Sequence, residues 1–382
     1  MGAAGGSHET TLYAAAAVEL RVRALSTDTR PMPEPVRVEA AIVTIEPRLE
    51  TEWDDLAVRT GAAPFARPAW VRAWTQASGL PVSAATVRLD GVLAAVLPIV
   101  ERRRWVRTAA DWHVPMLEAV FDDREALDHL VEHLLAGRRR VTVDFVLRDG
   151  ATALAFAEGF DRRGFRVRTR TRLASPFVEF GGEWEDYANS LSTKKWRELR
   201  RRRRRLAEQG PVEFDVRDGS FDLDRLLSEG FAIEGSGWKT LRGTAIASDR
   251  SIERFYRQVS CWAANEGMAR VSLLRVGGRP IAFDLSIVHG GVEWLLKTGF
   301  DPEWAAYSPG SLLRAEALRT AFEEKVRLYE FAGSAEAWKL EWTAATRDIV
   351  VLDGYAPGLG GAVALQVSRV KRRIRTLRSK EG

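Results

Sequence analysis

The stretch that decides the fold is Leu89-Asp90-Gly91-Val92-Leu93-Ala94-Ala95-Val96, because a close counterpart, Val276-Gly277-Gly278-Arg279-Pro280-Ile281-Ala282-Phe283, occurs in the second half of the chain. In each copy two turn residues lead into an apolar strand, and Asp-Gly between apolar runs is a strong signal for a β-hairpin. A helical stretch and a further strand follow each copy, the strand at residues 141–145 and at 326–331. We infer a duplicated fold unit, and a cleft between two such units is where ligands usually bind.

Bulk composition limits the kind of protein. The length of 382 residues allows two or three domains. The 57 basic and 52 acidic side chains leave a net charge of only +5, so any basic character must be local. The single cysteine, Cys261, excludes an internal disulfide and, with five scattered histidines, argues against a metal site. A reducing cytoplasm fits this cysteine usage best.

Two kinds of segment are not expected. No stretch has about 18 uncharged apolar residues, so we expect no transmembrane helix. Residues 1–35 are rich in Ala, Gly, Thr and Pro, and we expect a disordered extension there and no export signal.

The predicted elements of the second half follow one another closely. We expect helices at 223–234, 252–266 and 308–324, strands at 269–276, 281–288, 292–300 and 326–331, and a final strand at 347–352. A single long helix at 183–209 joins the two halves. This mixture of antiparallel strands and helices favours an α+β fold over a doubly wound sheet.

The segment 294–313 is the strongest indication of a binding site. A strand ends near Phe300, and after an irregular loop a helix begins at Ser308, Pro309 and Gly310. Ser308 suits the N-cap and Pro309 the first helical position, while Gly310 lets a ligand approach the backbone. Amide groups and the positive end of the helix dipole would then hold a pyrophosphate. The alternative is simply a well-capped helix start.

The order of these elements is that of the GNAT superfamily of N-acyltransferases, in which this helix start holds the pyrophosphate of acetyl-CoA. More narrowly, the sequence resembles the CelD/BcsL family of GNAT proteins through Glu234-Gly235-Ser236-Gly237-Trp238-Lys239, Gly278-Arg279-Pro280-Ile281-Ala282, Tyr307-Ser308-Pro309-Gly310 and Ala337-Trp338-Lys339. The first half resembles that family's degenerate N-terminal unit at Trp53, Phe65, Trp70 and Leu97-Pro98. The double layout also looks like the Fem-type peptidyltransferases, which take an aminoacyl group from tRNA.

The resemblance implies two tandem GNAT-like domains, the first degenerate and the second catalytic. The expected division is a disordered extension (1–35), a degenerate domain (36–182), a basic connecting helix (183–210), a catalytic domain (211–357) and a basic amphipathic tail (358–382).

The resemblance also implies that acetyl-CoA or another acyl-CoA is the co-substrate. Its expected binding residues are Thr298, Gly299, Phe300, Ser308, Gly310, Ser311 and Leu312. The usual helix-start pattern of the superfamily has Arg or Gln first and a small residue last, where this chain has Tyr307 and Leu312. Leu312 is therefore expected to crowd the approach of a ligand to the backbone.

Acyl transfer to an amine needs a base, donors for the carbonyl oxygen and an acid for the leaving group. Glu234 is the preferred base because it precedes a glycine-rich stretch, although it could instead pair with Lys239. Asp284 is a second candidate, since it interrupts an apolar strand where burial would raise its pKa, although it could also face solvent. Tyr307 would protonate the leaving thiolate, or pack against its neighbours.

Three lysines and two tryptophans are candidates for binding the acceptor. Lys239, Lys297 and Lys339 would bind phosphates or an anionic sugar, or be solvated surface charges. Trp238 and Trp338 would stack on a saccharide or adenine ring, or pack in the core.

Two segments concentrate positive charge. The run from Lys194 to Arg205 fits a solvated connecting helix, a phosphate-rich ligand, or nucleic acid including tRNA. Duplex DNA is excluded as a partner because no DNA-binding module accompanies the run. Residues 362–380 form a basic amphipathic helix, which would lie on an anionic membrane or dock on the protein.

The predicted function is transfer of an acetyl or other acyl group from acyl-CoA to an amine of a small metabolite or a saccharide precursor. One alternative is a Fem-like transferase that uses aminoacyl-tRNA. The other is a catalytically inactive GNAT-like subunit of an envelope or exopolysaccharide system. The absence of phosphate-loop, dinucleotide, zinc-protease and nucleophile-elbow motifs argues against phosphoryl transfer, hydride transfer and serine hydrolysis.

Overall fold

The computed structural model describes residues 36–236 and 249–378, and residues 37–382 group into one compact unit. The predicted disordered extension, Trp238 and Lys239 lie outside the described residues. Among the helices that are described, none is both long enough and apolar enough to cross a membrane.

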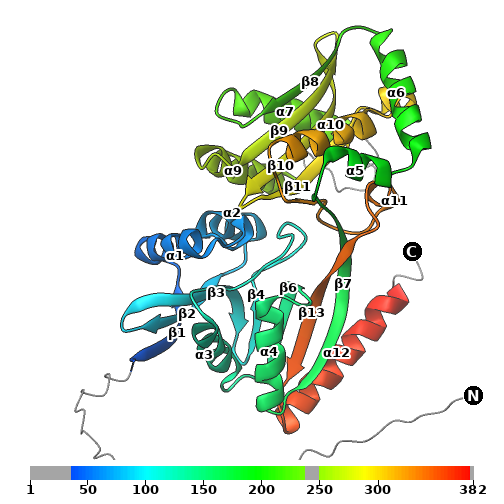
Figure 1. The fold of residues 1–382 in the computed structure, drawn as a ribbon. Coiled ribbons are helices and arrows are strands. Elements are labelled where there is room, and N and C mark those ends of the chain that lie inside the picture. The colour runs from blue at the N-terminus through cyan, green and yellow to red at the C-terminus, as the bar shows by residue number, and fades with distance from the viewer. Residues whose placement is uncertain (1–35, 237–248, 379–382) are drawn as a thin grey trace, which may run out of the picture. The chain divides into compact units, whose positions relative to one another are not determined.

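The described residues build one mixed sheet in the order β1-β2-β3-β4-β6-β13-β7-β12-β11-β10-β9-β8, with β5 paired to β3 (Figure 1). Its strands are β1 (Val38–Thr44), β2 (Ser83–Leu89), β3 (Val92–Arg102), β4 (Trp105–Thr108), β5 (Val120–Phe121), β6 (Arg140–Leu147), β7 (Arg166–Glu179), β8 (Val212–Arg217), β9 (Ala269–Val276), β10 (Arg279–His289), β11 (Val292–Phe300), β12 (Leu328–Glu330) and β13 (Thr346–Tyr355).

Helices pack against this sheet. The described helices are α1 (Pro47–Thr60), α2 (Pro68–Ser78), α3 (Arg124–Leu135), α4 (Ala151–Arg162), α5 (Trp184–Ser190), α6 (Thr193–Ala207), α7 (Leu223–Ser236), α9 (Arg250–Asn265), α10 (Pro309–Glu323), α11 (Ala337–Leu340) and α12 (Leu359–Arg378), with short 3-10 helices η1 (Pro64–Ala66) and η3 (Pro302–Tyr307). On β10, Phe283 packs against Gly230 of α7, while its neighbour Asp284 bonds to Arg314 of α10. Because successive strand residues face opposite sides, α7 and α10 cover opposite faces.

The two predicted tight turns are present. Asp90 and Gly91 have φ of 50° and 83°, and Gly277 and Gly278 have φ of 55° and 81°. Two consecutive left-handed residues are typical of the type I′ turn that matches the twist of a hairpin. The mixed sheet with its packed helices confirms the predicted α+β fold.

The long helix predicted at 183–209 is wrong, since α5 and α6 are separate helices. Leu191 and Ser192 between them are extended, with ψ of 155° and 127°. The indole Nε1 of Trp196 donates to the carbonyl of Ala188 at 2.7 Å, which folds α6 back on α5. The break lets Trp184 and Trp196 pack edge to face against one another, which a straight helix would prevent.

The last strand pairs with the first half of the chain. β13 lies antiparallel between β6 and β7, with Ile349 opposite Leu147 and Thr346 opposite Pro176. β7 continues beyond this pairing to bond with β12, so it belongs to both halves of the sheet. The predicted domain boundaries place β13 in the second domain, whereas its hydrogen bonds are to strands that precede residue 180.

Candidate active site

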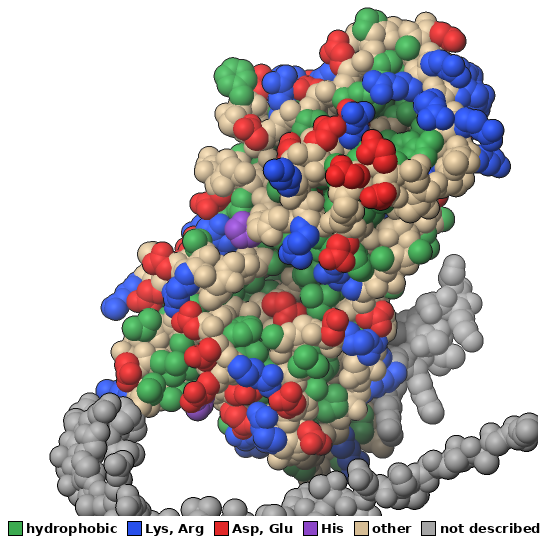
Figure 2. All heavy atoms as spheres, viewed as in Figure 1, with side chains coloured by type: hydrophobic (Ala, Val, Ile, Leu, Met, Phe, Trp, Pro, Cys, Tyr) green, Lys and Arg blue, Asp and Glu red, His purple; other side chains and the backbone are tan. Residues whose placement is uncertain are grey.

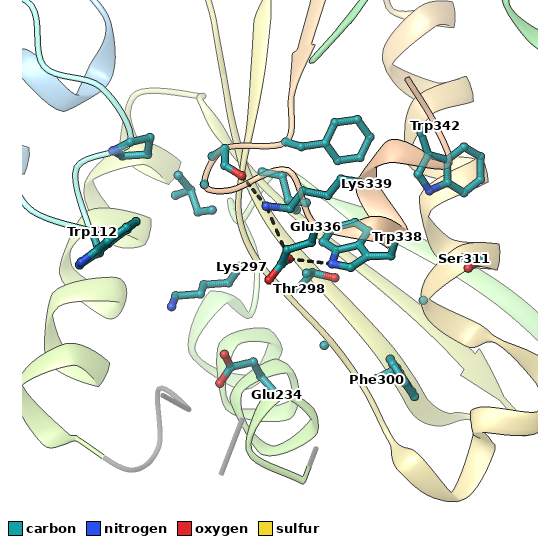
Figure 3. Close-up of a pocket in the computed structure, with 18 of the residues that line it drawn as sticks. Trp112, Glu234, Lys297, Thr298, Phe300, Ser311, Glu336, Trp338, Lys339 and Trp342 are labelled. Atoms are coloured by element: carbon teal, nitrogen blue, oxygen red, sulfur yellow. Dashed lines mark hydrogen bonds and ion pairs between the residues drawn. The ribbon is translucent and has the colours of Figure 1, made fainter. Parts of the chain in front are cut away.

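A cavity of about 690 Å³ lies where the two halves meet (Figure 3). Most of the predicted site residues line it, namely Glu234, Lys297, Thr298, Gly299, Phe300, Ser308, Gly310, Ser311, Trp338 and Lys339. The first half of the chain contributes Trp112, His113, Pro115, Phe145 and Leu173.

The cavity opens because β11 and β12 separate. Their parallel pairing covers only Val292 to Trp294, although β11 continues to Phe300. Residues 295–300 all line the cavity. Opposite β10 the register shifts at Leu296, so a β-bulge lies in the same stretch. This edge of β11 therefore faces the cavity and not a neighbouring strand.

A glycine brings the predicted base to this edge. Glu234 lies in the last turn of α7, is 1% exposed and lines the cavity. A Cβ placed on Gly299 would lie 2.8 Å from the Cα of Glu234. Only glycine therefore allows α7 to approach β11 closely enough for the Glu234 carboxyl to reach the site.

A second cluster lies beside Glu234. The Tyr256 hydroxyl and Nδ1 of His113 are 3.1 Å apart, and the Lys297 ammonium lies 4.7 Å from the centre of the Tyr256 ring. Burial lowers the pKa of His113, an effect that Asp111 opposes and Lys297 reinforces. Burial also raises the pKa of Tyr256, and the nearby carboxylates of Asp111 and Glu234 raise it further. At neutral pH the histidine is thus mainly neutral and the tyrosine protonated.

The loop before α11 forms another wall. The Lys339 ammonium donates to the carbonyl oxygens of Ala332 at 2.6 Å and Ser334 at 3.1 Å. These bonds accompany a left-handed backbone at Ala332, with φ of 49°. The indole of Trp338 donates to the Glu336 carboxylate at 2.8 Å, as the dashed lines of Figure 3 show. Lys339 therefore has a structural use in holding the loop, in addition to its place on the cavity wall.

The start of α10 differs from the expected N-cap. Ser308 is left-handed with φ of 50°, and its hydroxyl caps no backbone amide. The hydroxyl instead accepts a hydrogen bond from Arg202 of α6. The Leu312 side chain is 4% exposed in an apolar cluster and does not line the cavity, although it was expected to crowd a ligand there.

Two predicted catalytic residues do not line the cavity. Asp284 is 1% exposed and accepts a hydrogen bond of 2.7 Å from buried Arg314. It faces neither the cavity nor solvent, because α10 covers that face of β10. Tyr307 packs against Trp304, and the guanidinium of Arg205 lies 5.6 Å from the centre of its ring.

Several site residues were missed from the sequence. Phe145 has a left-handed backbone with φ of 58° in the middle of β6, and the Asp144 carboxylate accepts from its amide at 3.0 Å. This irregular residue makes an edge contact with Trp112, at 5.5 Å between ring centres. The adjacent aromatic residues Trp112 and His113, which follow an apolar strand, were the sequence feature that could have indicated this part of the site. No local feature of the sequence marks Tyr256 as a site residue.

A sequence comparison identifies the fold family of the second half. Residues 193–340 match the family model described as the acetyltransferase (GNAT) domain. This region is similar to a GNAT domain. The match begins at α6 and ends at α11, so the GNAT region holds Glu234, the β11 edge and the start of α10. No curated protein matches the chain.

Solved structures show the same fold over most of the chain. FemX is 12% identical with a TM-score of 0.56, and the alignment covers 86% of this chain and 99% of FemX. The C-terminal domain of a putative lysylphosphatidylglycerol synthetase from Agrobacterium fabrum is 13% identical, with a TM-score of 0.52 and coverage of 84% and 96%. L-PGS from Bacillus licheniformis is 11% identical, with a TM-score of 0.52 and coverage of 86% and 97%. Likeness at this identity shows the GNAT-like fold alone.

Proposed function

We propose that this protein transfers an acetyl or other acyl group from acyl-CoA to an amine of a small metabolite or a saccharide precursor. The observation that carries the proposal is that the diverging edge of β11, the start of α10 and the Glu234 carboxyl all line one cavity. A donor, a base and an acceptor can meet there.

The residues present fit an acyl-CoA. An extended pantetheine chain can bond to the backbone edge of residues 295–300, as an added strand would. A pyrophosphate fits over Gly310 and Ser311, where a Cβ on Gly310 would have only one neighbour, Phe300 at 3.5 Å. The start of the α10 dipole would attract the pyrophosphate, and Arg202 of α6, which also pairs with Glu198 at 2.6 Å, lies beside it. When bound, acyl-CoA supplies a thioester whose carbonyl carbon an amine can attack.

The residues near the middle of the cavity would serve the acyl transfer. Glu234 would accept a proton from the acceptor ammonium, and the backbone around the Leu296 bulge would donate to the carbonyl oxygen. Tyr256, whose hydroxyl stays protonated at neutral pH, lines the cavity and is better placed than Tyr307 to protonate the leaving thiolate.

The acceptor would enter from the first half of the chain. In Figure 3 Trp112 and Ser311 lie on opposite sides of the view, with Lys297 and Glu234 between them. Trp112 is 63% exposed although it contacts Phe145, so one face of the indole is open to a ligand. A sugar or another ring with an amine would stack there and present the amine toward Glu234.

Calorimetry with acetyl-CoA tests the donor directly. We expect a saturable heat of binding to the folded protein, which is lost when a competing CoA analogue occupies the site. If no heat appears at millimolar acetyl-CoA with protein that is folded by circular dichroism, the acyl-CoA proposal is wrong.

A second candidate is a Fem-like transferase that uses aminoacyl-tRNA. The observation in its favour is that α6 contacts η3 and the start of α10, and Lys and Arg side chains gather over this helix (Figure 2). Binding of tRNA in a gel shift that persists at moderate salt, together with no binding of acetyl-CoA, would favour it. If labelled acetyl-CoA and charged tRNA both fail to label any acceptor in a cell extract, the chain acts as an inactive GNAT-like subunit.

A further inference from the structure

The last helix presents an apolar stripe away from the protein. α12 runs alongside β7 and β13 (Figure 1), and the Tyr355 hydroxyl and the Ser368 hydroxyl are 2.8 Å apart on its inner side. On its outer side Leu359, Val363 and Val367 are 87%, 61% and 48% exposed. These three residues are four positions apart, so they form one continuous stripe along the helix. We call them the α12 stripe.

The sequence extends the same spacing toward the end of the helix. Val370, Ile374 and Leu377 follow at intervals of three and four within α12, which continues to Arg378. Seven basic residues and no acidic residue occur in the segment 369–380, which contains Arg369, Lys371, Arg372, Arg373, Arg375, Arg378 and Lys380. The helix therefore combines an aliphatic stripe with a strongly positive charge.

A basic groove lies beside the same helix. Leu365 of α12 lines it together with Arg166 and Arg168 of β7 and Tyr355 of β13, in a volume of about 400 Å³. Asp353 on the adjoining strand neutralises Arg140 at 2.6 Å and Arg170 at 3.0 Å. Within residues 36–236 and 249–378, neither Arg166 nor Arg168 has such an acidic partner. Their guanidinium groups can therefore bind an anion next to α12.

We propose that α12 and the adjacent basic groove bind the surface of an anionic lipid bilayer. The α12 stripe inserts among the acyl chains, and the basic residues, with Arg166 and Arg168, contact lipid phosphates. A second copy of the chain is a poorer occupant, because it would bring two strongly positive helices together. A nucleic acid would satisfy the charges but would leave the aliphatic stripe in water.

Vesicle flotation of the full chain tests the proposal. We expect the protein to float with vesicles of phosphatidylcholine containing about 30% phosphatidylglycerol and to stay in solution with phosphatidylcholine alone. Raising NaCl from about 0.1 M to about 1 M is expected to release most of it, because salt screens the lipid charge. Equal flotation with both vesicle types, or none with the anionic vesicles at low salt, overturns the proposal.

Variants separate the stripe from general charge effects. Val363→Glu is expected to weaken binding to anionic vesicles at least tenfold. Val58→Glu makes the same change at a 58% exposed position of α1 and is expected to leave binding unchanged. Arg166→Gln combined with Arg168→Gln is expected to weaken binding about fivefold for each arginine lost. Wild-type flotation of the Val363→Glu protein would overturn the proposal.

Two controls distinguish other outcomes. Binding of acetyl-CoA is expected to be the same in Val363→Glu as in the wild type, because none of the described side chains of α12 lines the active-site cavity. Size-exclusion chromatography is expected to show the same mass for both proteins. A dimer that Val363→Glu dissociates would identify the stripe as a contact between copies and would contradict the membrane proposal.

Discussion

The two halves of the sheet have similar strand arrangements, but they differ at the parallel strand pair in each half. In the first half β4 pairs in parallel with β6 over three positions, from Trp105 to Arg107, and β4 ends one residue later. In the second half β11 pairs with β12 over three positions, and then β11 continues for six residues to Phe300. Those six residues line the cavity, whereas the first half leaves its corresponding strand short. The cavity thus depends on β11, which extends beyond its pairing with the parallel strand β12.

The helices that follow these strands also differ at their first turn. At the start of α3 the Asp123 carboxylate accepts a hydrogen bond of 2.8 Å from the amide of Ala126. At the start of α10 the Ser308 side chain caps no amide. A carboxylate at a helix start satisfies an amide and repels an anion, so only α10 is suited to bind a phosphate. Of these two helix starts, only that of α10 lacks a side-chain cap and so could bind the proposed pyrophosphate.

The largest expected effect concerns the base of the second half. Glu234→Gln should lower kcat by about 100-fold or more, because the amide cannot accept a proton, while the Kd for acetyl-CoA changes little. Steady-state kinetics with calorimetry measures both quantities. Glu229→Gln on the same helix is the matched control, since Glu229 bonds to Arg275 outside the cavity, and it should keep normal kcat. Equal activity of Glu234→Gln would remove Glu234 as the base.

The next effect concerns Glu330, which joins the halves at β12. Burial raises the pKa of Glu330 to about 7, while Arg347 and Ser175 on the neighbouring strands oppose the shift. Because the folded state binds this proton more tightly, its stabilisation is present below the unfolded pKa of 4.5 and is lost as pH rises toward 7. The unfolding free energy of the wild type should therefore fall between pH 5 and 8. In Glu330→Gln this fall should be smaller by up to about 3 kcal/mol.

Urea unfolding at several pH values measures this effect, and Asp353 on β13 gives a control of opposite sign. Although burial opposes them, Arg140, Thr142 and Arg170 hold the pKa of Asp353 below its usual 3.8. Its stabilisation is therefore present above pH 3.8 and lost on acidification. Identical pH profiles for the wild type and Glu330→Gln would contradict the assignment.

A smaller effect comes from making α10 resemble α3. Ser308→Asp places a carboxylate at the start of α10, and aspartate tolerates the left-handed backbone there. We expect the Kd for acetyl-CoA to rise about tenfold through repulsion of the pyrophosphate. Ser308→Asn is the uncharged control and should bind nearly as the wild type does. A normal Kd for Ser308→Asp would place the pyrophosphate elsewhere.

The smallest effect is expected from the converse change in the first half. Asp123→Ala removes the cap of α3 and should lower the unfolding free energy by about 1 kcal/mol. Acetyl-CoA binding and kcat should stay normal, because Asp123 does not line the cavity. A change in Kd would show that the first half also takes part in donor binding.

Local patterns predicted the parts of the fold that depend on neighbouring residues. The turns at Asp90-Gly91 and Gly277-Gly278 were recognisable because they need a left-handed backbone, and the apolar runs after them became buried strands. The pairing of β13 with β6 was not recognisable, because it joins residues about 200 positions apart. Strand periodicity shows that a strand exists and says nothing about its partner.

The same distinction applies to the site. A resemblance of sequence marked Glu234 and residues of β11 as candidates, and they line the cavity. The bond of Asp284 to Arg314 could not be predicted, because Arg314 lies 30 residues away on α10. Trp112, His113 and Phe145 enter the cavity only through the contact between the halves. That contact includes the bond of Arg67 to Glu266 at 3.0 Å, which no local pattern contains.

The position of β13 has a consequence for synthesis on the ribosome. β6 and β7 each leave one edge without its partner until the strand at residues 346–355 has been made. Roughly 200 residues separate β6 from that strand, so at about 5–20 residues per second the gap lasts about 10–40 s. During this interval the nascent chain carries two exposed strand edges, which are the usual starting points for association between chains. The order of elements therefore makes the first half depend on the last part of the chain to finish folding.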